Sequence, residues 1–180
     1  MHKDWVTALV LPMTVVVSPA FSTEYLSIEQ TQQAIFSDAT TFTEHLINIS
    51  DLDKGQIKKL SGKRQRWDHQ RVWRAQKQGK NLGWFLIDNV VGKHEFITYG
   101  VGISETGDIT GIEIMTYRET HGDEVRDEEW RQNFTDKTLD DTFKLDEDIP
   151  NITGATLSAR NITDGVKRLL ALHKVVLRNE

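Results

Sequence analysis

The residues best suited to chemistry in this chain lie in the stretch Ile152-Thr153-Gly154-Ala155-Thr156-Leu157-Ser158. The stretch places hydroxyls among small residues and leads into an amphipathic segment that ends near residue 173. The apolar residues of that segment recur with the period of one helical face, at Ile162, Val166, Leu169 and Leu170. A turn at the start of a helix presents unpaired N–H groups and the positive end of the helix dipole. The pattern therefore predicts an anion site, most naturally for a phosphate.

Each residue of this turn has a chemical part in that prediction. Gly154 allows a positive φ, and Ala155 is small enough for the backbone to approach a ligand closely. Thr156 supplies a nucleophilic oxygen, while Ser158 is placed to donate to a phosphate or to cap the helix. A hydroxyl is a poor nucleophile without an activating base, and no such base stands beside Thr156 in the sequence.

Two further stretches precede the turn. Tyr117-Arg118-Glu119-Thr120-His121-Gly122 is a polar segment at the end of a predicted strand. Residues 130–137 carry Trp130 and Phe134, whose main predicted role is packing in the core.

The elements that must position these stretches predict an α+β fold. Residues 23–65 are predicted to be helical, with a cap at residues 50–53 before a second short helix near residues 56–60. Residues 72–75 and 82–87 are predicted to form a hairpin, followed by strands over residues 96–103 and 109–117. This indicates an antiparallel meander of about four or more strands. A short helix over residues 127–134, an acidic connector over residues 135–150 and the C-terminal helix follow.

Composition and the N-terminus narrow the class of protein. The chain has 180 residues, a net charge of −5 and no cysteine, which excludes disulfides, cysteine-ligated iron–sulfur clusters and c-type haem attachment. It shows no basic stripe interleaved with aromatic residues, so nucleic acid is not an expected partner. An apolar run over residues 6–17, followed by small residues at cleavage spacing, predicts a secretory signal peptide over residues 1–22 and a periplasmic or other extracytoplasmic location.

In order and spacing, the three stretches together resemble the FMN-binding domain family. The family's attachment motif is Ser/Thr-Gly-Ala-Thr, matched here by Thr153-Gly154-Ala155-Thr156. Its Glu-Thr-Pro-Gly loop is matched by Glu119-Thr120-His121-Gly122, with His121 in place of the proline. The resemblance covers roughly residues 70–172 and extends to the FMN-carrying subunits of the sodium-pumping quinone reductase and of the Rnf complexes. The Asp that the family commonly has six residues before the acceptor Thr is Pro150 here, with Asp148 nearby.

The resemblance implies an exported electron carrier, rather than a stand-alone enzyme, with FMN bound through a phosphoester to Thr156. It implies an FMN-binding domain over residues 67–180, after an N-terminal helical segment over residues 23–66. The implied partners are a flavin transferase that uses FAD and a divalent cation, and redox proteins or a membrane electron-transfer complex. The implied cofactor-binding residues around the attachment point and the flavin are Thr153, Gly154, Ala155, Leu157, Ser158, Glu119, Thr120, His121 and Gly122.

Two alternatives stay open: a metal-binding or hydrolytic module, and a cofactor-free binding module of the same fold. The candidate metal ligands are His94, Glu95, His121, Asp123 and Glu124, although no His-Glu-x-x-His spacing is present. Pro150 is the main argument for the cofactor-free module. Two other patterns are interpreted as structural. The basic residues are interpreted as a solvated helix face, and they are Lys58, Lys59, Lys63, Arg64 and Arg66. The tryptophans are interpreted as sheet and core packing, and they are Trp67, Trp73 and Trp84.

Overall fold

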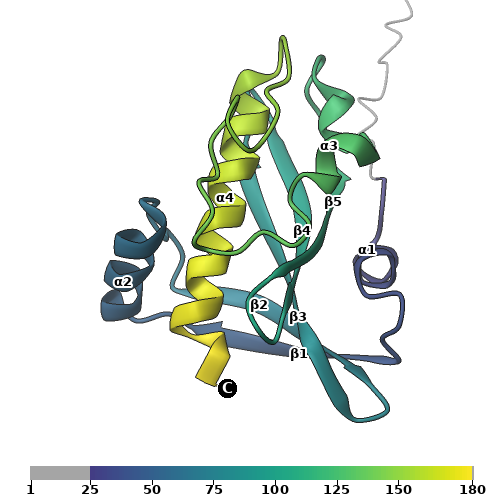
Figure 1. Ribbon diagram of the computed structural model, residues 1–180, viewed down its shortest axis with the longest axis vertical. Coiled ribbons are helices and arrows are strands. Elements are labelled where there is room, and N and C mark those ends of the chain that lie inside the picture. The colour runs from purple at the N-terminus through teal and green to yellow at the C-terminus, as the bar shows by residue number, and fades with distance from the viewer. Residues whose placement is uncertain (1–24, 180) are drawn as a thin grey trace, which may run out of the picture.

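The computed structural model describes residues 25–179, so the expected signal peptide at residues 1–22 lies outside the described residues. The described chain forms one antiparallel sheet with helices on both faces (Figure 1). The strands are β1 (Thr41–Asn48), β2 (His69–Lys77), β3 (Lys80–Val91), β4 (Phe96–Ser104) and β5 (Ile109–Thr116), and they pair in chain order. The predicted α+β class, the meander and the C-terminal helix are confirmed.

β2, β3, β4 and β5 are joined by short turns, as the glycines and polar residues between them predicted, whereas residues 49–68 connect β1 to β2. At the β2–β3 turn, Gln78 and Gly79 both have positive φ, at 51° and 79°, the combination that fits the right-handed twist of a tight hairpin. Consecutive strands run antiparallel, so the β3–β4 turn and the end of β5 lie at the same end of the sheet. That shared end is where the polar loops meet.

The prediction that residues 23–65 are helical is wrong for Thr41–Asn48, which form the edge strand β1. The four-residue spacing of Phe42 and Leu46 imitates a helix. Most side chains of this edge strand are exposed and only Ile47 is buried, so little alternation of polar and apolar residues is left. The β-branched residues of the segment favour the strand. Since β1 pairs with β2, the sheet includes residues on both sides of the expected boundary at residues 66–67.

Two helices pack on this sheet, and a third packs on one of them. α1 (Ile28–Ile35) covers one face, and α4 (Thr156–Val175) covers the other with α2 (Asp51–Ser61) beside it (Figure 1). Two short helical segments, η1 (Asp123–Arg126) and α3 (Glu128–Gln132), follow β5, and η2 (Leu177–Asn179) follows α4. No helix among residues 25–179 combines the length and the apolar character needed to cross a membrane.

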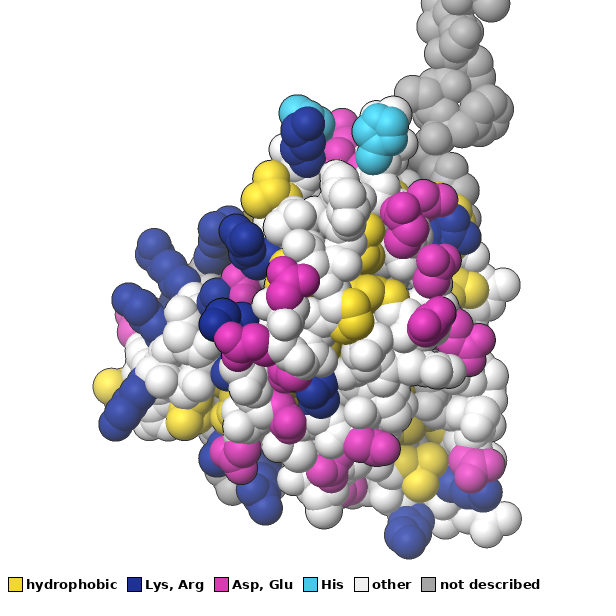
Figure 2. Space-filling view, turned by 45° about the horizontal axis from the view of Figure 1, so that its top comes forward, with side chains coloured by type: hydrophobic (Ala, Val, Ile, Leu, Met, Phe, Trp, Pro, Cys, Tyr) yellow, Lys and Arg dark blue, Asp and Glu magenta, His cyan; other side chains and the backbone are white. Residues whose placement is uncertain are grey.

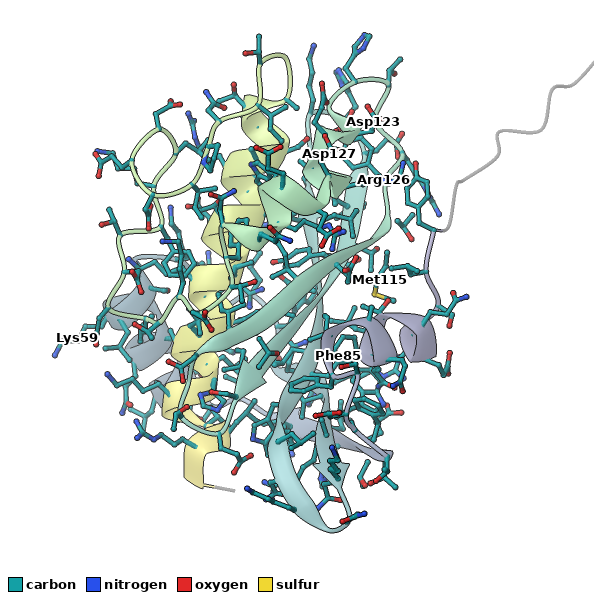
Figure 3. The ribbon with its side chains drawn as sticks, turned by 45° about the vertical axis from the view of Figure 1, so that its right-hand side comes forward. Lys59, Phe85, Met115, Asp123, Arg126 and Asp127 are labelled. Atoms are coloured by element: carbon teal, nitrogen blue, oxygen red, sulfur yellow. The ribbon has the colours of Figure 1, made fainter. Side chains whose placement is uncertain are left out.

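The core has one part on each face of the sheet. Leu86 lies in the larger cluster under α4, whereas its neighbour Phe85 lies in the smaller cluster under α1 (Figure 3). This alternation follows from the two-residue period of a strand. The predicted face of the last helix is confirmed, because its apolar residues are buried in the larger cluster: Ile162, Val166, Leu169 and Leu170. Each such side chain contributes about 1.5–3 kcal/mol by leaving water.

Two structural interpretations of the sequence need correction. α2 ends at Ser61 with Gly62 at φ 72°, so the basic residues after it lie on a loop and not on a helix face. Of the three tryptophans expected in the sheet and core, Trp73 and Trp84 are buried, but Trp67 is 63% exposed on that same loop. The helix ended earlier than the charge pattern suggested because glycine at the left-handed position satisfies its last carbonyls.

Candidate functional site

The start of α4 is an open helix end. Thr156 is the first residue of the helix, and Ala155 before it has no side chain that can cap the N–H groups. The first turn contains no acidic residue. The unpaired N–H groups and the positive end of the helix dipole are therefore left for an acceptor from outside the helix.

The turn before Thr156 needs its small residues for two different reasons. Gly154 has φ +86° and open space where a Cβ would stand, so its backbone conformation is what favours glycine. Ala155 is 5% exposed and packs against the loop that follows β5. A Cβ added to Gly122 would lie 2.0 Å from the Cβ of Ala155. The small size of Ala155 therefore serves the contact between this loop and the helix start.

A hollow of about 440 Å³ lies where the β3–β4 turn, the loop after β5 and the start of α4 meet. Its position follows from the antiparallel order, which brings the first two segments to one end of the sheet. The helix start supplies the third wall. The hollow is lined by Lys93, His94, Glu119, Thr120, His121, Gly154, Ala155, Thr156, Leu157 and Ser158.

Glu119 fastens two of these walls together. Its Oε1 accepts hydrogen bonds from the backbone N–H groups of His94 and Glu95, at 2.6 and 3.0 Å. Burial acts to raise the pKa of this carboxyl, but hydrogen bonds from the N–H groups of residues 93–95 outweigh it, so the pKa lies below its ordinary value. A Cβ on Gly92 would come within 2.4 Å of the same oxygen. Glu119 therefore orients the β3–β4 turn and holds Lys93 and His94 at the hollow.

Tyr117 fastens the remaining wall. Its hydroxyl donates to the carbonyl of His121 at 2.6 Å and lies 3.4 Å from the Oγ of Ser158. Burial raises the pKa of this hydroxyl, which keeps it a donor. Ser158 is buried and faces Tyr117, while the side chain of His121 is exposed at the hollow. The loop after β5 is thus attached to α4 through its own backbone.

The segment after this loop supports the site through packing. Trp130 and Phe134 are buried with ring centres 5.0 Å apart, as the sequence indicated. The indole N–H of Trp130 donates to the carbonyl of Pro150 at 2.8 Å, which ties α3 to the connector just before the turn. Asp148 accepts from the backbone N–H groups of Phe143 and Lys144 at 2.9 and 2.7 Å, so its carboxylate organises the connector.

The hollow brings together most of the cofactor-binding residues predicted from the sequence. Thr153 and Gly122 do not line it: Thr153 is exposed just before it, and Gly122 is buried behind Ala155. Lys93 was missed, and His94 was considered only as a metal ligand. The antiparallel order of β3, β4 and β5 is the signal that could have found both, because it places the β3–β4 turn beside the end of β5.

Thr156 borders a second hollow of about 430 Å³ on its other side. The connector, the end of α2 and the exposed face of α4 form its walls. Its charged lining residues are Lys63, Lys144, Asp146, Arg160, Asp164 and Lys167. Thr156 is half-buried at the junction of the two hollows and is the residue that they share.

The residues considered as metal ligands do not converge. Within the described part of the chain, no three His, Asp or Glu side chains lie close enough to hold a metal ion together. Glu119, the carboxylate that lines the hollow with the two histidines, is already engaged by backbone N–H groups. The hollow offers the open helix N–H groups, the Lys93 cation and hydroxyl side chains, which is the chemistry of an anion site.

Three comparisons with known proteins bear on this site. Residues 92–171 match the family model described as FMN-binding domain, and this range contains the hollow. The crystal structure of Shewanella oneidensis NqrC shares the fold, with a TM-score of 0.55 and 18% identity over 79% of this chain and 87% of that one. No curated protein matches the sequence. The resemblance to FMN-binding domains predicted from the sequence is thereby confirmed.

Proposed function

We propose that this chain, with its FMN-binding domain at residues 92–171, carries FMN as a phosphoester of the Thr156 hydroxyl and passes electrons through it. The observation that carries the proposal is the position of that hydroxyl. It lies on the first residue of a helix whose N–H groups have no side-chain cap, at the edge of a hollow of about 440 Å³. The apolar run at residues 6–17 supports an extracytoplasmic location.

The residues present fit a flavin phosphate. The open start of α4 offers N–H groups to the phosphate oxygens, and the first turn has no carboxylate to repel them. Gly154 leaves open space beside the turn, and Lys93 adds a cation at the hollow. A cofactor held by a covalent bond is not lost by diffusion, which suits a protein that works outside the cytoplasm.

The attachment step uses the Thr156 hydroxyl as the nucleophile. Its Oγ1 attacks the FMN phosphorus of FAD, the new P–O bond forms, the pyrophosphate bond breaks and AMP leaves. The hydroxyl proton must pass to a base, and within residues 25–179 no carboxylate or imidazole is hydrogen-bonded to Thr156. The base is therefore supplied by the flavin transferase, and redox proteins or a membrane electron-transfer complex are the further partners of the loaded protein.

The chain's own residues then hold and shield the site. FMN supplies reversible electron transfer at its isoalloxazine ring when bound. Glu119 keeps the β3–β4 turn in place through its backbone hydrogen bonds, so Lys93 and His94 stay at the hollow. Tyr117 holds the carbonyl of His121, which fixes the opposite wall. These contacts position the walls before any cofactor arrives.

The test is the intact mass of the mature protein, unfolded first, from cells that also supply an exported flavin transferase. We expect an added mass of one FMN less water, complete loss of it in Thr156→Val, and retention in Thr156→Ser. Covalent flavin on the Thr156→Val protein would overturn the assignment. An unmodified wild-type protein, from cells whose transferase modifies a second substrate, would favour a cofactor-free binding module.

A further inference from the structure

The loop of residues 62–68 between α2 and β2 plays no part in the proposed flavin site, yet its conformation is fixed. Gln65 is 2% exposed, and its side chain donates to the carbonyl of Trp67 at 3.2 Å and accepts from the guanidinium of Arg168 on α4. With Gln65 anchored inward, its neighbours Arg64 and Arg66 are exposed. The loop therefore presents two arginines and a tryptophan from a rigid base.

That base is a buried polar network. Arg168 pairs with Asp88 on β3 at 2.5 Å, and Asp88 accepts the hydroxyl of Tyr99 on β4 at 2.6 Å. A Cβ on Gly165 would lie 2.0 Å from that hydroxyl, so α4 sits tightly on the network. A buried charge pair of this kind is costly to break, which keeps the loop, the helix and the sheet in one arrangement.

A groove of about 350 Å³ runs along this loop between β3, β4 and α4. Its rim carries large apolar side chains that stay in water: Trp67 is 63% exposed, Phe96 61% and Val91 42%. Asn161 on α4 donates to the carbonyl of Val91 at 2.6 Å, which holds the two sides of the groove together. We call Arg64, Arg66, Trp67, Val91 and Phe96 the basic aromatic groove. Exposed aromatic and arginine side chains around a concavity are typical of protein interfaces.

The charge around the groove is opposite to that of the whole chain. The net charge is −5, but Lys and Arg gather on the side that carries α2, where Lys59 points away from the sheet (Figures 2 and 3). Asp123 and Asp127 lie on the other side, near α3 (Figure 3). Among the described residues, Arg64 and Arg66 form no ion pair, and neither do Lys58 and Lys59. This face can therefore attract an acidic partner over a distance.

The groove is close to the proposed flavin attachment point. It shares Lys63 and Asp164 with the second hollow, and that hollow reaches Thr156. Asp164 is eight residues after Thr156 on α4, which is about 12 Å along the helix axis. A partner seated in the groove would thus lie beside the site.

We propose that the basic aromatic groove is the docking site for a redox partner protein with an acidic surface. The redox role of the partner rests on the proposed function, whereas its acidic and apolar character follows from the groove itself. A concave site with a buried polar base and an aromatic rim fits a protein surface. A flat anionic lipid surface would use the same cations but would not need the groove.

The test is calorimetric binding of the full chain to an oxidised, acidic plant-type ferredoxin, used as a probe at low and high salt. We expect Arg64→Glu/Arg66→Glu to weaken binding at least about tenfold at low salt, and 0.5 M NaCl to abolish that difference. Lys80→Glu/Lys174→Glu is the matched control, because it changes the net charge equally at exposed positions outside the groove; we expect a change within about twofold. Trp67→Ala/Phe96→Ala should weaken binding at both salt concentrations.

Three results would overturn the proposal: no binding of the probe by the wild-type chain, equal weakening by both charge-reversal variants, or binding only to vesicles of phosphatidylcholine and phosphatidylglycerol. Circular dichroism must show each variant folded. The same titration with the Thr156→Val chain should give the same affinity, since docking requires no flavin. If the wild-type chain fails to take up flavin but still binds the probe, the result contradicts the proposed function and supports docking at the groove.

Discussion

The helices α2 and α4 begin in opposite ways. At the start of α2, Ser50 accepts the N–H of Asp53 at 3.2 Å, and the carboxylate of Asp53 accepts the N–H of Ser50 at 2.9 Å. Asp51 adds a second negative charge to the first turn. At the start of α4, Ala155 and Thr156 provide neither a cap nor a charge. The chain thus caps the start of α2 with its own side chains and leaves the start of α4 without a side-chain cap.

The difference shows what each helix depends on. α2 is short and mostly exposed, so its caps contribute a large share of its stability. α4 has twenty residues with a continuous buried face and is stable without a cap. Of the two helices, only α4, which packs on the core, stays stable with an uncapped N-terminus. The following changes test that distinction, from the largest expected effect to the smallest.

Gly122→Ala should be the most damaging change to the start of α4. Gly122 has φ +90°, and an added Cβ would collide with Ala155, so we expect a loss of about 3 kcal/mol in the free energy of unfolding. Gly62→Ala, at the end of α2, is the control: φ is +72° but nothing lies within 4 Å, and we expect about 1 kcal/mol. Urea unfolding measures both. Equal losses would show that backbone strain, and not the contact with Ala155, dominates.

The two helices also differ near their C-terminal ends, and the pH dependence of unfolding tests this difference. α2 ends with exposed Lys58 and Lys59, whereas α4 contains buried His173, whose pKa is lowered from 6.5 to about 4 by burial and then by Arg178. Because the unfolded chain binds this proton more readily, the contribution is complete above pH 6.5 and is lost as the pH falls toward 4. We expect a loss of about 3 kcal/mol from this group. In His173→Gln, the free energy of unfolding should change less with pH between 6.5 and 4. An unchanged slope would assign the acid sensitivity to other groups.

Ser50→Ala removes the cap of α2 and should lower the free energy of unfolding by about 1 kcal/mol. Flavin loading on Thr156 should not change, because the start of α2 is not part of the proposed phosphate site. Thermal unfolding and intact mass report the two effects separately. A loss of loading with a native circular dichroism spectrum would contradict the separation of the two helix starts.

Leu157→Glu adds to α4 the negative charge that α2 already has. Leu157 is 46% exposed, so the carboxylate can stay in water beside the helix end. We expect a gain of about 0.5 kcal/mol in unfolding free energy and, at the same time, slower attachment of FMN, because the carboxylate repels the incoming phosphate. Leu157→Gln is the control for the lost apolar side chain. Faster loading of the Glu variant would contradict a phosphate at this helix end.

The sequence predicted the parts of the fold whose signals are local. The strands after residue 69, the helix starting near Thr156 and the cap at Ser50 follow from periodicity and turn chemistry and are present in the structure. β1 was missed because an edge strand with exposed side chains has little pattern to read. The end of α2 lies within one residue of the predicted end, but Lys63, Arg64 and Arg66 were assigned to a helix face because Gly62 was not weighed as a helix terminator.

Long-range contacts limited the reading of the site. The sequence indicated that Glu119 and Ala155 mattered, and it implied contact with the cofactor for both. In the structure Glu119 holds the β3–β4 turn and Ala155 packs against the loop after β5. Neither contact can be seen without knowing that residues far apart in the chain share one end of the sheet. Pairing the strands in chain order would have predicted that neighbourhood.

The order of the elements along the chain also sets the order in which the site can exist. Each strand pairs with the strand next to it in sequence, and from β2 to β5 the sheet can grow by closing short loops one after another. The hollow, in contrast, joins residues 93–94 and 119–121 to residues 154–158, and α4 follows all five strands along the chain. Until α4 docks, the hollow lacks its third wall, which carries Thr156. A transferase that recognises this hollow would therefore modify chains in which α4 has docked and would not modify chains in which it has not.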